Sequence, residues 1–177
     1  MPATNFTTLT NMTMDPTGSV YKSSGGSAWN GMAITDEITF QSGSQMTATN
    51  FDLSNAKNMF GIGTNVAGNQ TTFYFTIWPE TGNSAYVGIG GTLTNYPITW
   101  SSSTIFKIIH TGTAIEFYGD STLLYSYTTT GSTTGHYKVM SKEEMDAADV
   151  IECTDTDSRP PGGSGTRYPP PPIQVRF

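Results

Sequence analysis

The fold class is decided by residues 104–125, which read TIFKIIHTGTAIEFYGDSTLLY. β-Branched and aromatic residues fill the stretches Thr104–His110, Thr113–Tyr118 and Thr122–Tyr127, and this composition favours strands. Thr111-Gly112 predicts a tight hairpin turn between the first two stretches, and a short polar turn follows Tyr118. The run therefore predicts three consecutive antiparallel strands.

The same pattern continues upstream through most of the chain. Gly, Asn, Ser, Asp and Pro separate short apolar stretches, and helical periodicity is nearly absent before residue 139. Many short strands at spacings of about 8–12 residues are typical of a sandwich or barrel. The further expected strands are Ala33–Gln41, Met46–Phe51, Met59–Gly63, Thr71–Trp78 and Ser84–Gly90.

Alternation along these strands indicates which side chains face the core. Side chains two apart on a strand share one face, so Phe75 and Ile77 are expected to oppose Tyr74 and Trp78. The expected core between two antiparallel sheets comprises Phe73, Phe75, Ile77, Val87, Ile89, Ile115 and Phe117.

The chain of 177 residues has the length of one domain, and composition divides it into four segments. We expect an N-terminal arm with the first strands over 1–32, the β-sandwich over 33–138, an acidic segment over 139–157, and a Pro/Gly-rich arm over 158–177. In the acidic segment, Ser141 and Glu144 form a capping-box pattern, which predicts one short helix from Lys142 to about Val150. The prediction is thus an all-β, single antiparallel jelly-roll sandwich with one short C-terminal helix and extended arms.

Charge and hydropathy exclude several classes of protein. Only 12% of residues are charged, against about 25% in an average soluble protein, and the net charge is −6. A basic footprint for nucleic acid is absent, and no apolar run has the roughly 18 residues of a membrane span. A single cysteine, Cys153, permits no intrachain disulfide, and the start of the chain does not have the pattern of a secretory signal.

Three pieces of the middle region carry a resemblance to a known family. They are NMFGIGT at 58–64, YVGIGG at 86–91, and the strand–turn–strand–turn–strand run at 104–125. From about Asn58 to Thr130 the chain resembles the concanavalin A-like jelly-roll family, which includes lectins, glucanases, laminin-G-like domains and viral surface proteins. The resemblance implies a two-sheet antiparallel sandwich, and it does not imply a ligand, because fold does not fix function.

The sequence predicts no catalytic site. The glucanases of this family place carboxylates on one strand in the pattern Glu-x-Asp-x-x-Glu, which is absent here. A glycosidase needs two carboxylates that face one cleft. The neighbours Asp36 and Glu37 would point to opposite faces of a strand, and Glu80 and Asp120 fall in turns. We therefore expect solvated acids at the surface; these are Asp36, Glu37, Asp52, Glu80, Glu116 and Asp120.

Nucleophilic and metal chemistry find no better support. Cys153, His110 and His136 match no catalytic signature, and the acidic residues before Cys153 raise a thiol pKa. The run Asp155–Asp157 offers fewer oxygens than a calcium site needs. We expect neither a metal site nor a cofactor.

Carbohydrate binding is the strongest small-ligand hypothesis. Tyr74 and Trp78 lie at even spacing on one strand, and Tyr86 and Tyr118 are candidates to join them across neighbouring strands. Such aromatic platforms combine an apolar face with a polar handle and suit sugar rings. The alternative is that these rings cover the second sheet or support the N-terminal segment.

The C-terminal segment predicts an assembly arm. A Gly-Gly-Ser-Gly linker precedes four prolines, which favour an extended polyproline II conformation. Apolar anchors alternate with arginines, so we expect the segment to dock on a neighbouring subunit. The arm residues are Arg159, Arg167, Tyr168, Pro169, Pro170, Pro171, Pro172, Ile173, Val175, Arg176 and Phe177.

These observations lead to a hypothesis of a non-enzymatic structural protein, most simply a viral minor capsid, cement or surface protein. Its partners would be the major capsid protein, other assembly subunits or copies of itself, and its place would be the virion, assembled in the host cell. A cytoplasmic location or exposure on the surface of a particle is the alternative. The alternative functions are a lectin-like module, as at a fibre tip, and then a glucanase-like enzyme.

Overall fold

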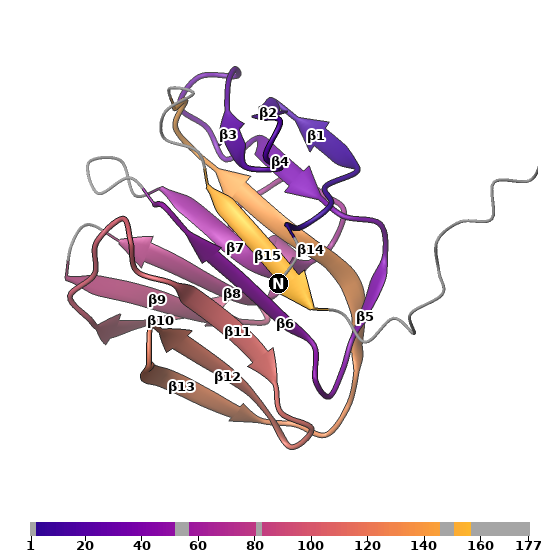
Figure 1. Cartoon of the computed structure of the whole chain (residues 1–177), viewed down its shortest axis with the longest axis vertical. Helices are drawn as coiled ribbons and strands as arrows, with labels where there is room; N and C mark the ends of the chain where they lie inside the picture. The colour runs from indigo at the N-terminus through magenta and orange to yellow at the C-terminus, as the bar shows by residue number, and fades with distance from the viewer. Residues whose placement is uncertain (1–2, 52–56, 81–82, 146–150, 157–177) are drawn as a thin grey trace, which may run out of the picture.

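The chain folds as a sandwich of two main antiparallel β-sheets (Figure 1). The structure is a computed structural model that describes residues 3–51, 57–80, 83–145 and 151–156. Every strand pair among these residues is antiparallel. The predicted all-β jelly-roll sandwich is confirmed.

The larger sheet has eight strands. Its order is β1-β4-β14-β7-β8-β9-β10, and β5 also pairs with β14. The bounds are β1 Thr8–Thr10, β4 Gly31–Ile34, β5 Ile38–Phe40, β7 Asn58–Gly63, β8 Phe73–Glu80, β9 Ser84–Ile89, β10 Thr92–Pro97 and β14 Thr133–Ser141.

The second sheet has five strands in the order β13-β12-β11-β6-β15. A separate pair, β2 (Met12–Met14) and β3 (Val20–Lys22), lies with the other N-terminal strands at the top of Figure 1, and η1 (Gln70–Thr72) is a single 3-10 turn. The five strands are β6 Gln45–Thr49, β11 Phe106–His110, β12 Ala114–Gly119, β13 Thr122–Thr128 and β15 Glu152–Thr156.

Residues 104–125, which predicted the fold class, form β11, β12 and β13, as the turn residues of this stretch indicated. Ile109 pairs with Glu116, and Glu116 pairs with Ser126. The register of β12 and β13 shifts between Phe117 and Tyr118, so that an extra residue, Leu124, enters the core. Gly112 has a φ of +98°, which explains why glycine occupies that turn.

Most of the expected core lies between the two sheets. Phe75, Ile77, Val87, Ile115 and Phe117 belong to one buried cluster. The Phe75 ring lies 6.4 Å from the Phe40 ring and 6.5 Å from the Phe117 ring, centroid to centroid. This cluster joins the two layers and carries most of the apolar burial.

Phe73 is the exception, because a β-bulge changes the alternation of β8. Ile62 pairs with Phe75 but Gly63 pairs with Phe73, so Tyr74 has no partner of its own in the ladder. Phe73 is buried, but in a second cluster with Met32, Ile34, Met59 and Met140. The expectation that Phe73 and Phe75 share one face was therefore wrong.

The predicted helix is not seen. Ser141 ends β14, and the described residues after it, up to Met145, are not helical, while 146–150 lie outside the described residues. The carboxylate of Glu144 does not close a capping box: it accepts from the backbone N–H of Gly26 at 2.6 Å. Glu143 likewise accepts from the Ser27 hydroxyl at 2.8 Å. Both acids hold the loop before β4, and a loop contact replaces the helical turn.

The N-terminal segment packs on its own domain and does not extend away from it. β1 pairs with β4, and Phe6, Met12 and Val20 are buried in the main core. Three strands that the sequence analysis did not predict, β10, β14 and β15, complete the sheets. No helix in the described part of the chain has the length and apolarity that a membrane crossing needs.

Candidate ligand-binding groove

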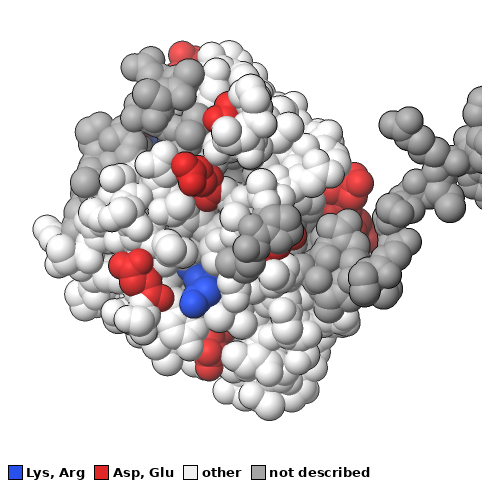
Figure 2. Space-filling model, viewed as in Figure 1, with Lys and Arg blue, Asp and Glu red and all other residues white. Residues whose placement is uncertain are grey.

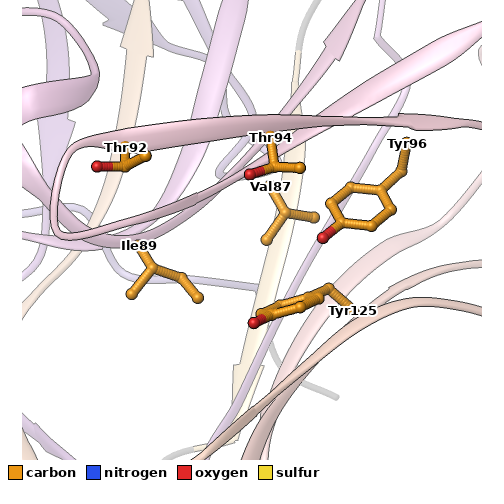
Figure 3. A pocket seen from close by; sticks show the side chains of 6 residues that line it. All are labelled: Val87, Ile89, Thr92, Thr94, Tyr96 and Tyr125. Atoms are coloured by element: carbon orange, nitrogen blue, oxygen red, sulfur yellow. The ribbon is translucent and has the colours of Figure 1, made fainter.

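A groove opens at one rim of the sandwich, where the edge strand of each sheet comes close to the other. Its volume is about 200 Å³. It is lined by Val87, Ile89, Thr92, Thr94, Tyr96 and Tyr125 (Figure 3). Strands β9 and β10 supply the first five side chains, and β13 supplies Tyr125.

The β9–β10 hairpin builds one wall. Gly90 and Gly91 have φ values of +56° and +84°, so two glycines make the tight turn that pairs Ile89 with Thr92. Val87 then pairs with Thr94. Alternation therefore places two aliphatic and two hydroxyl side chains on the same face.

Two tyrosines form the mouth of the groove. The rings of Tyr96 and Tyr125 lie 5.7 Å apart at 38°, and Tyr125 lies 6.4 Å from the core ring of Phe117. Tyr127 continues the row along β13, with its ring 6.1 Å from Phe75. Tyr125 and Tyr127 are 37% and 39% exposed, so both rings have an accessible surface.

The groove is electrically neutral. None of its six lining residues is charged. Burial, and then the nearby Tyr125, raise the pKa of Tyr96, so its phenol stays protonated at ordinary pH. The lining therefore offers apolar surface together with neutral hydroxyl donors and acceptors. The surface seen in Figure 2 is likewise mostly uncharged, with scattered acidic side chains and one small basic patch.

The four aromatic residues expected from the sequence do not form one platform. Trp78 and Tyr86 lie together, with ring centroids 5.2 Å apart, but Trp29 packs edge-on against Trp78 at 5.6 Å. Tyr74 lies at the bulge of β8, where its ring comes close to the position of Gly135.

Tyr118 belongs to the other sheet. It lies on β12, where its hydroxyl donates to Glu116 at 2.6 Å and Lys107 lies 5.1 Å from its ring. The sequence pattern placed Tyr118 with residues of β8 and β9, whereas the structure separates them by the thickness of the sandwich.

Two acids of the middle region, Asp36 and Asp120, accept structural hydrogen bonds. Asp36 accepts from the Thr7 hydroxyl at 2.9 Å, and Asp120 accepts from the Ile105 amide at 2.9 Å. Asp52 lies outside the described residues. Among residues that the structure describes, no three His, Cys, Asp or Glu side chains gather as a metal site would require.

The histidines and the cysteine have structural surroundings. His110 is buried, accepts at Nδ1 from the Gly112 amide at 3.0 Å, and lies with Nε2 2.9 Å from the Gly131 carbonyl. His136 Nδ1 lies 2.8 Å from the Thr35 carbonyl oxygen. Cys153 is buried, and burial followed by the charges of nearby acids raises the pKa of its thiol, so it is a poor nucleophile.

Two buried lysines donate hydrogen bonds to loop oxygens. Lys22 Nζ donates to the carbonyls of Gly26, Ala28 and Lys142. Lys138 Nζ donates to the Val66 carbonyl at 2.6 Å and to the Thr72 hydroxyl at 2.7 Å. The Lys138 amine closes a loop over the outer side of the larger sheet, beside the Phe73 ring, whereas the Lys22 side chain lies next to Gly31 at the start of β4.

Comparison with solved structures places the fold. The PSpry domain of TRIM65 matches with a TM-score of 0.55 and 11% identity over 86% of this chain and 91% of that domain. The SPRY domain of human HERC1 matches with a TM-score of 0.53 and 14% identity over 84% of this chain and 93% of that domain. These proteins share its fold. They are jelly-roll sandwiches of the concanavalin A-like superfamily, so the architecture that the resemblance implied is confirmed.

A weaker likeness extends to the carbohydrate-binding module CBM66 from Bacillus subtilis, with a TM-score of 0.49 and 11% identity over 86% of this chain and 94% of that module. No protein-family model matches the sequence, and no curated protein matches it. At these identities the likeness concerns the fold alone.

The groove was missed by the sequence analysis, although its pattern is visible. Thr92, Thr94 and Tyr96 alternate along β10, and Tyr125 and Tyr127 alternate along β13. The arm residues from Arg159 to Phe177 lie outside the described residues, so the structure does not place them.

Proposed function

We propose that this protein is a non-catalytic binding module that takes a neutral carbohydrate in the groove between β10 and β13. The observation that carries the proposal is the pairing of the Tyr96 and Tyr125 rings, 5.7 Å apart, beside the threonines of β10. Tyrosine faces pack against the C–H surface of a sugar ring, while hydroxyl groups exchange hydrogen bonds with its own hydroxyls.

The size and charge of the groove restrict the class of carbohydrate that it can bind. Its volume of about 200 Å³ is below the roughly 300–1,000 Å³ of sites for drug-sized ligands, which suits one or two sugar units. A uronic acid or a sulfated sugar would need a cationic partner, and no lining residue is cationic. Neutral hexose polymers are therefore the class to test first.

The absence of catalysis is part of the proposal. Glycoside hydrolysis requires two carboxylates about 5–10 Å apart that flank the bond. The lining residues include no acid, and the Glu116 carboxylate accepts from Tyr118 instead. We expect no cleavage of β-glucans at any pH from acid to neutral. Turnover that Glu116→Gln or Glu80→Gln abolishes would overturn this expectation.

Affinity electrophoresis and calorimetry with neutral polysaccharides test the binding. Tyr125→Ala removes one ring, and stacking of this kind is worth about 0.5–1.5 kcal/mol, so the affinity should fall roughly twofold to thirteenfold. Tyr118→Ala is the matched control, because that ring does not line the groove and its hydroxyl donates to Glu116. Equal losses in the two variants, or no binding to any neutral glycan, would reject the groove as the site.

A second candidate is the structural role in a virus particle, with the tail as an assembly arm. It is supported by the low charge of the chain and by the apolar anchors and arginines of residues 158–177. Deletion of these residues should reduce incorporation into particles, and salt should weaken docking only in part, because apolar contacts are not screened. Normal incorporation of the truncated chain would reject this role.

A further inference from the structure

The groove has the chemistry of a second kind of ligand, a proline-rich peptide. Recognition of polyproline II segments relies on grooves lined by aromatic side chains, which pack against proline rings. Tyr96, Tyr125 and Tyr127 provide such a row along two facing edge strands. The chain itself contains one segment of this kind, Tyr168–Ile173, which reads YPPPPI.

We infer that the groove between β10 and β13 is occupied by the chain's own segment Tyr168–Ile173. The inference deepens the proposed function, because a docked tail would exclude a glycan from the same tyrosines. It differs from the assembly-arm role, in which the tail reaches a neighbour.

The dimensions of the two partners agree. Four polyproline residues extend about 12 Å, and the wall from Thr92 to Tyr96 extends about 13 Å along its strand. Tyr125 and Tyr127 are two strand residues apart, about 6.7 Å, while two polyproline residues advance about 6.2 Å. Every second proline is therefore level with one of the two tyrosines.

The tail starts within reach of the groove. Thr156 pairs with Gln45, Gln45 with Ile109, Ile109 with Glu116, and Glu116 with Ser126. The end of β15 is therefore level with Ser126 of β13 and about 19 Å away, at four strand spacings of about 4.8 Å. The twelve residues 157–168 span up to about 40 Å, enough to cross the sheet and turn around its edge.

Charge favours the same pairing. All 14 acids precede residue 158, and three of the eight basic residues follow it, so the body carries −9 and the tail +3. At one end of the groove, Glu80 pairs with Ser84, which pairs with Pro97 of β10. Asp120 follows Gly119, whose position lies against Ile98, the residue after Pro97. The arginine that flanks the prolines on that side, Arg167 or Arg176, would thus lie near carboxylates.

The linker favours docking within one chain. Gly162-Gly163-Ser164-Gly165 is a flexible spacer, and short flexible spacers give effective concentrations in the millimolar range. A contact too weak to hold two separate molecules together is then populated inside one. Polyproline also loses little conformational freedom on docking, which limits the entropic cost.

A spin label tests the inference in the full-length chain. Gln174→Cys provides the attachment site, because Cys153 is buried and its thiol is inaccessible. In a ¹⁵N-labelled chain that carries the label, the amide signals of β10 and β13 should lose intensity, while those of β1 at the far edge of the larger sheet should keep it. Uniform intensity across the chain would overturn the inference.

A mixed sample distinguishes docking of the tail within one chain from docking on a second copy. Spin-labelled ¹⁴N chain added to unlabelled ¹⁵N chain should leave the β10 and β13 signals unchanged. Broadening in that mixture would mean that the tail of a second copy occupies the groove, and it would overturn self-docking.

Two variants keep the test specific. The double variant Pro170→Gly/Pro171→Gly leaves the sandwich untouched and should abolish the intensity loss at β10 and β13. Tyr125→Ala should abolish it as well. Tyr118→Ala should retain it. These measurements contain no glycan, so a failure of glycan binding does not affect them. Conversely, if glycan binding holds and the tail docks for nine-tenths of the time, deleting residues 158–177 should tighten the glycan Kd about tenfold.

Discussion

The bulge in β8 makes neighbouring residues differ sharply in their expected cost of truncation. Phe75 is 7% exposed and contacts the rings of Phe40, Phe117 and Tyr127. An aromatic side chain buries about 150–250 Å², which at about 25 cal/mol per Å² corresponds to roughly 4–6 kcal/mol. Because alanine retains part of this area, Phe75→Ala should lower the free energy of unfolding by about 3–5 kcal/mol.

Tyr74→Ala is the matched comparison. Tyr74 is 38% exposed and has no ladder partner in β7, so its truncation should cost about 1 kcal/mol or less. Urea unfolding followed by tryptophan fluorescence gives both values, with the denaturant slope compared to confirm that the denatured state is unchanged. A Phe75→Ala cost below that of Tyr74→Ala would mean that the alternation at the bulge is reversed and that our assignment of faces is wrong.

Three further perturbations test other parts of the fold. Burial lowers the pKa of Lys138 to about 8. Between pH 8 and 10.5 the unfolded chain therefore binds more protons than the folded chain, and the free energy of unfolding should rise with pH. Denaturant titrations of Lys138→Met over the same pH range should show a smaller rise. Gly61→Ala should prevent soluble expression or lower Tm strongly, because the φ of Gly61 is +155° and a Cβ there would overlap the Phe75 carbonyl oxygen. Gly131→Ala is the control: a Cβ at Gly131 would meet only one distant side-chain atom, so Tm should stay nearly unchanged. Deletion of residues 158–177 should leave the circular dichroism spectrum and the cooperative unfolding of the sandwich intact, because the strands of both described sheets end by Thr156, and a loss of cooperative unfolding would contradict this.

Local patterns predicted the hairpins well because their information lies within a few residues. Thr111-Gly112 fixes the turn between β11 and β12, and the alternation of Ile115 and Phe117 fixes the buried face. These features depend on backbone conformation and on period-two burial, both of which the sequence displays directly.

The errors arose where distant residues decide the local structure. Glu144 matches a capping box, but its carboxylate accepts from the amide of Gly26, in the loop before the neighbouring strand β4. Strand β14 contains His136 and Lys138, which look unsuited to a central strand until Val66 and Thr72 provide acceptors for the amine. The approach of β10 to β13, the edge strands of the two sheets, creates the groove and likewise has no signal within a single strand.

The position of β14 has a consequence for the order in which the protein can fold during synthesis. This strand lies between β4 and β7, yet it follows both in the chain. The 78 residues from Gly63 to Ser141 take about 4–16 s to translate at 5–20 residues per second. Throughout that interval, β4 and β7 each present an unpaired edge in the nascent chain, which invites association with other chains. We therefore expect the yield of folded protein to depend on elongation rate and on chaperones that cover those two edges until the ribosome delivers their shared partner.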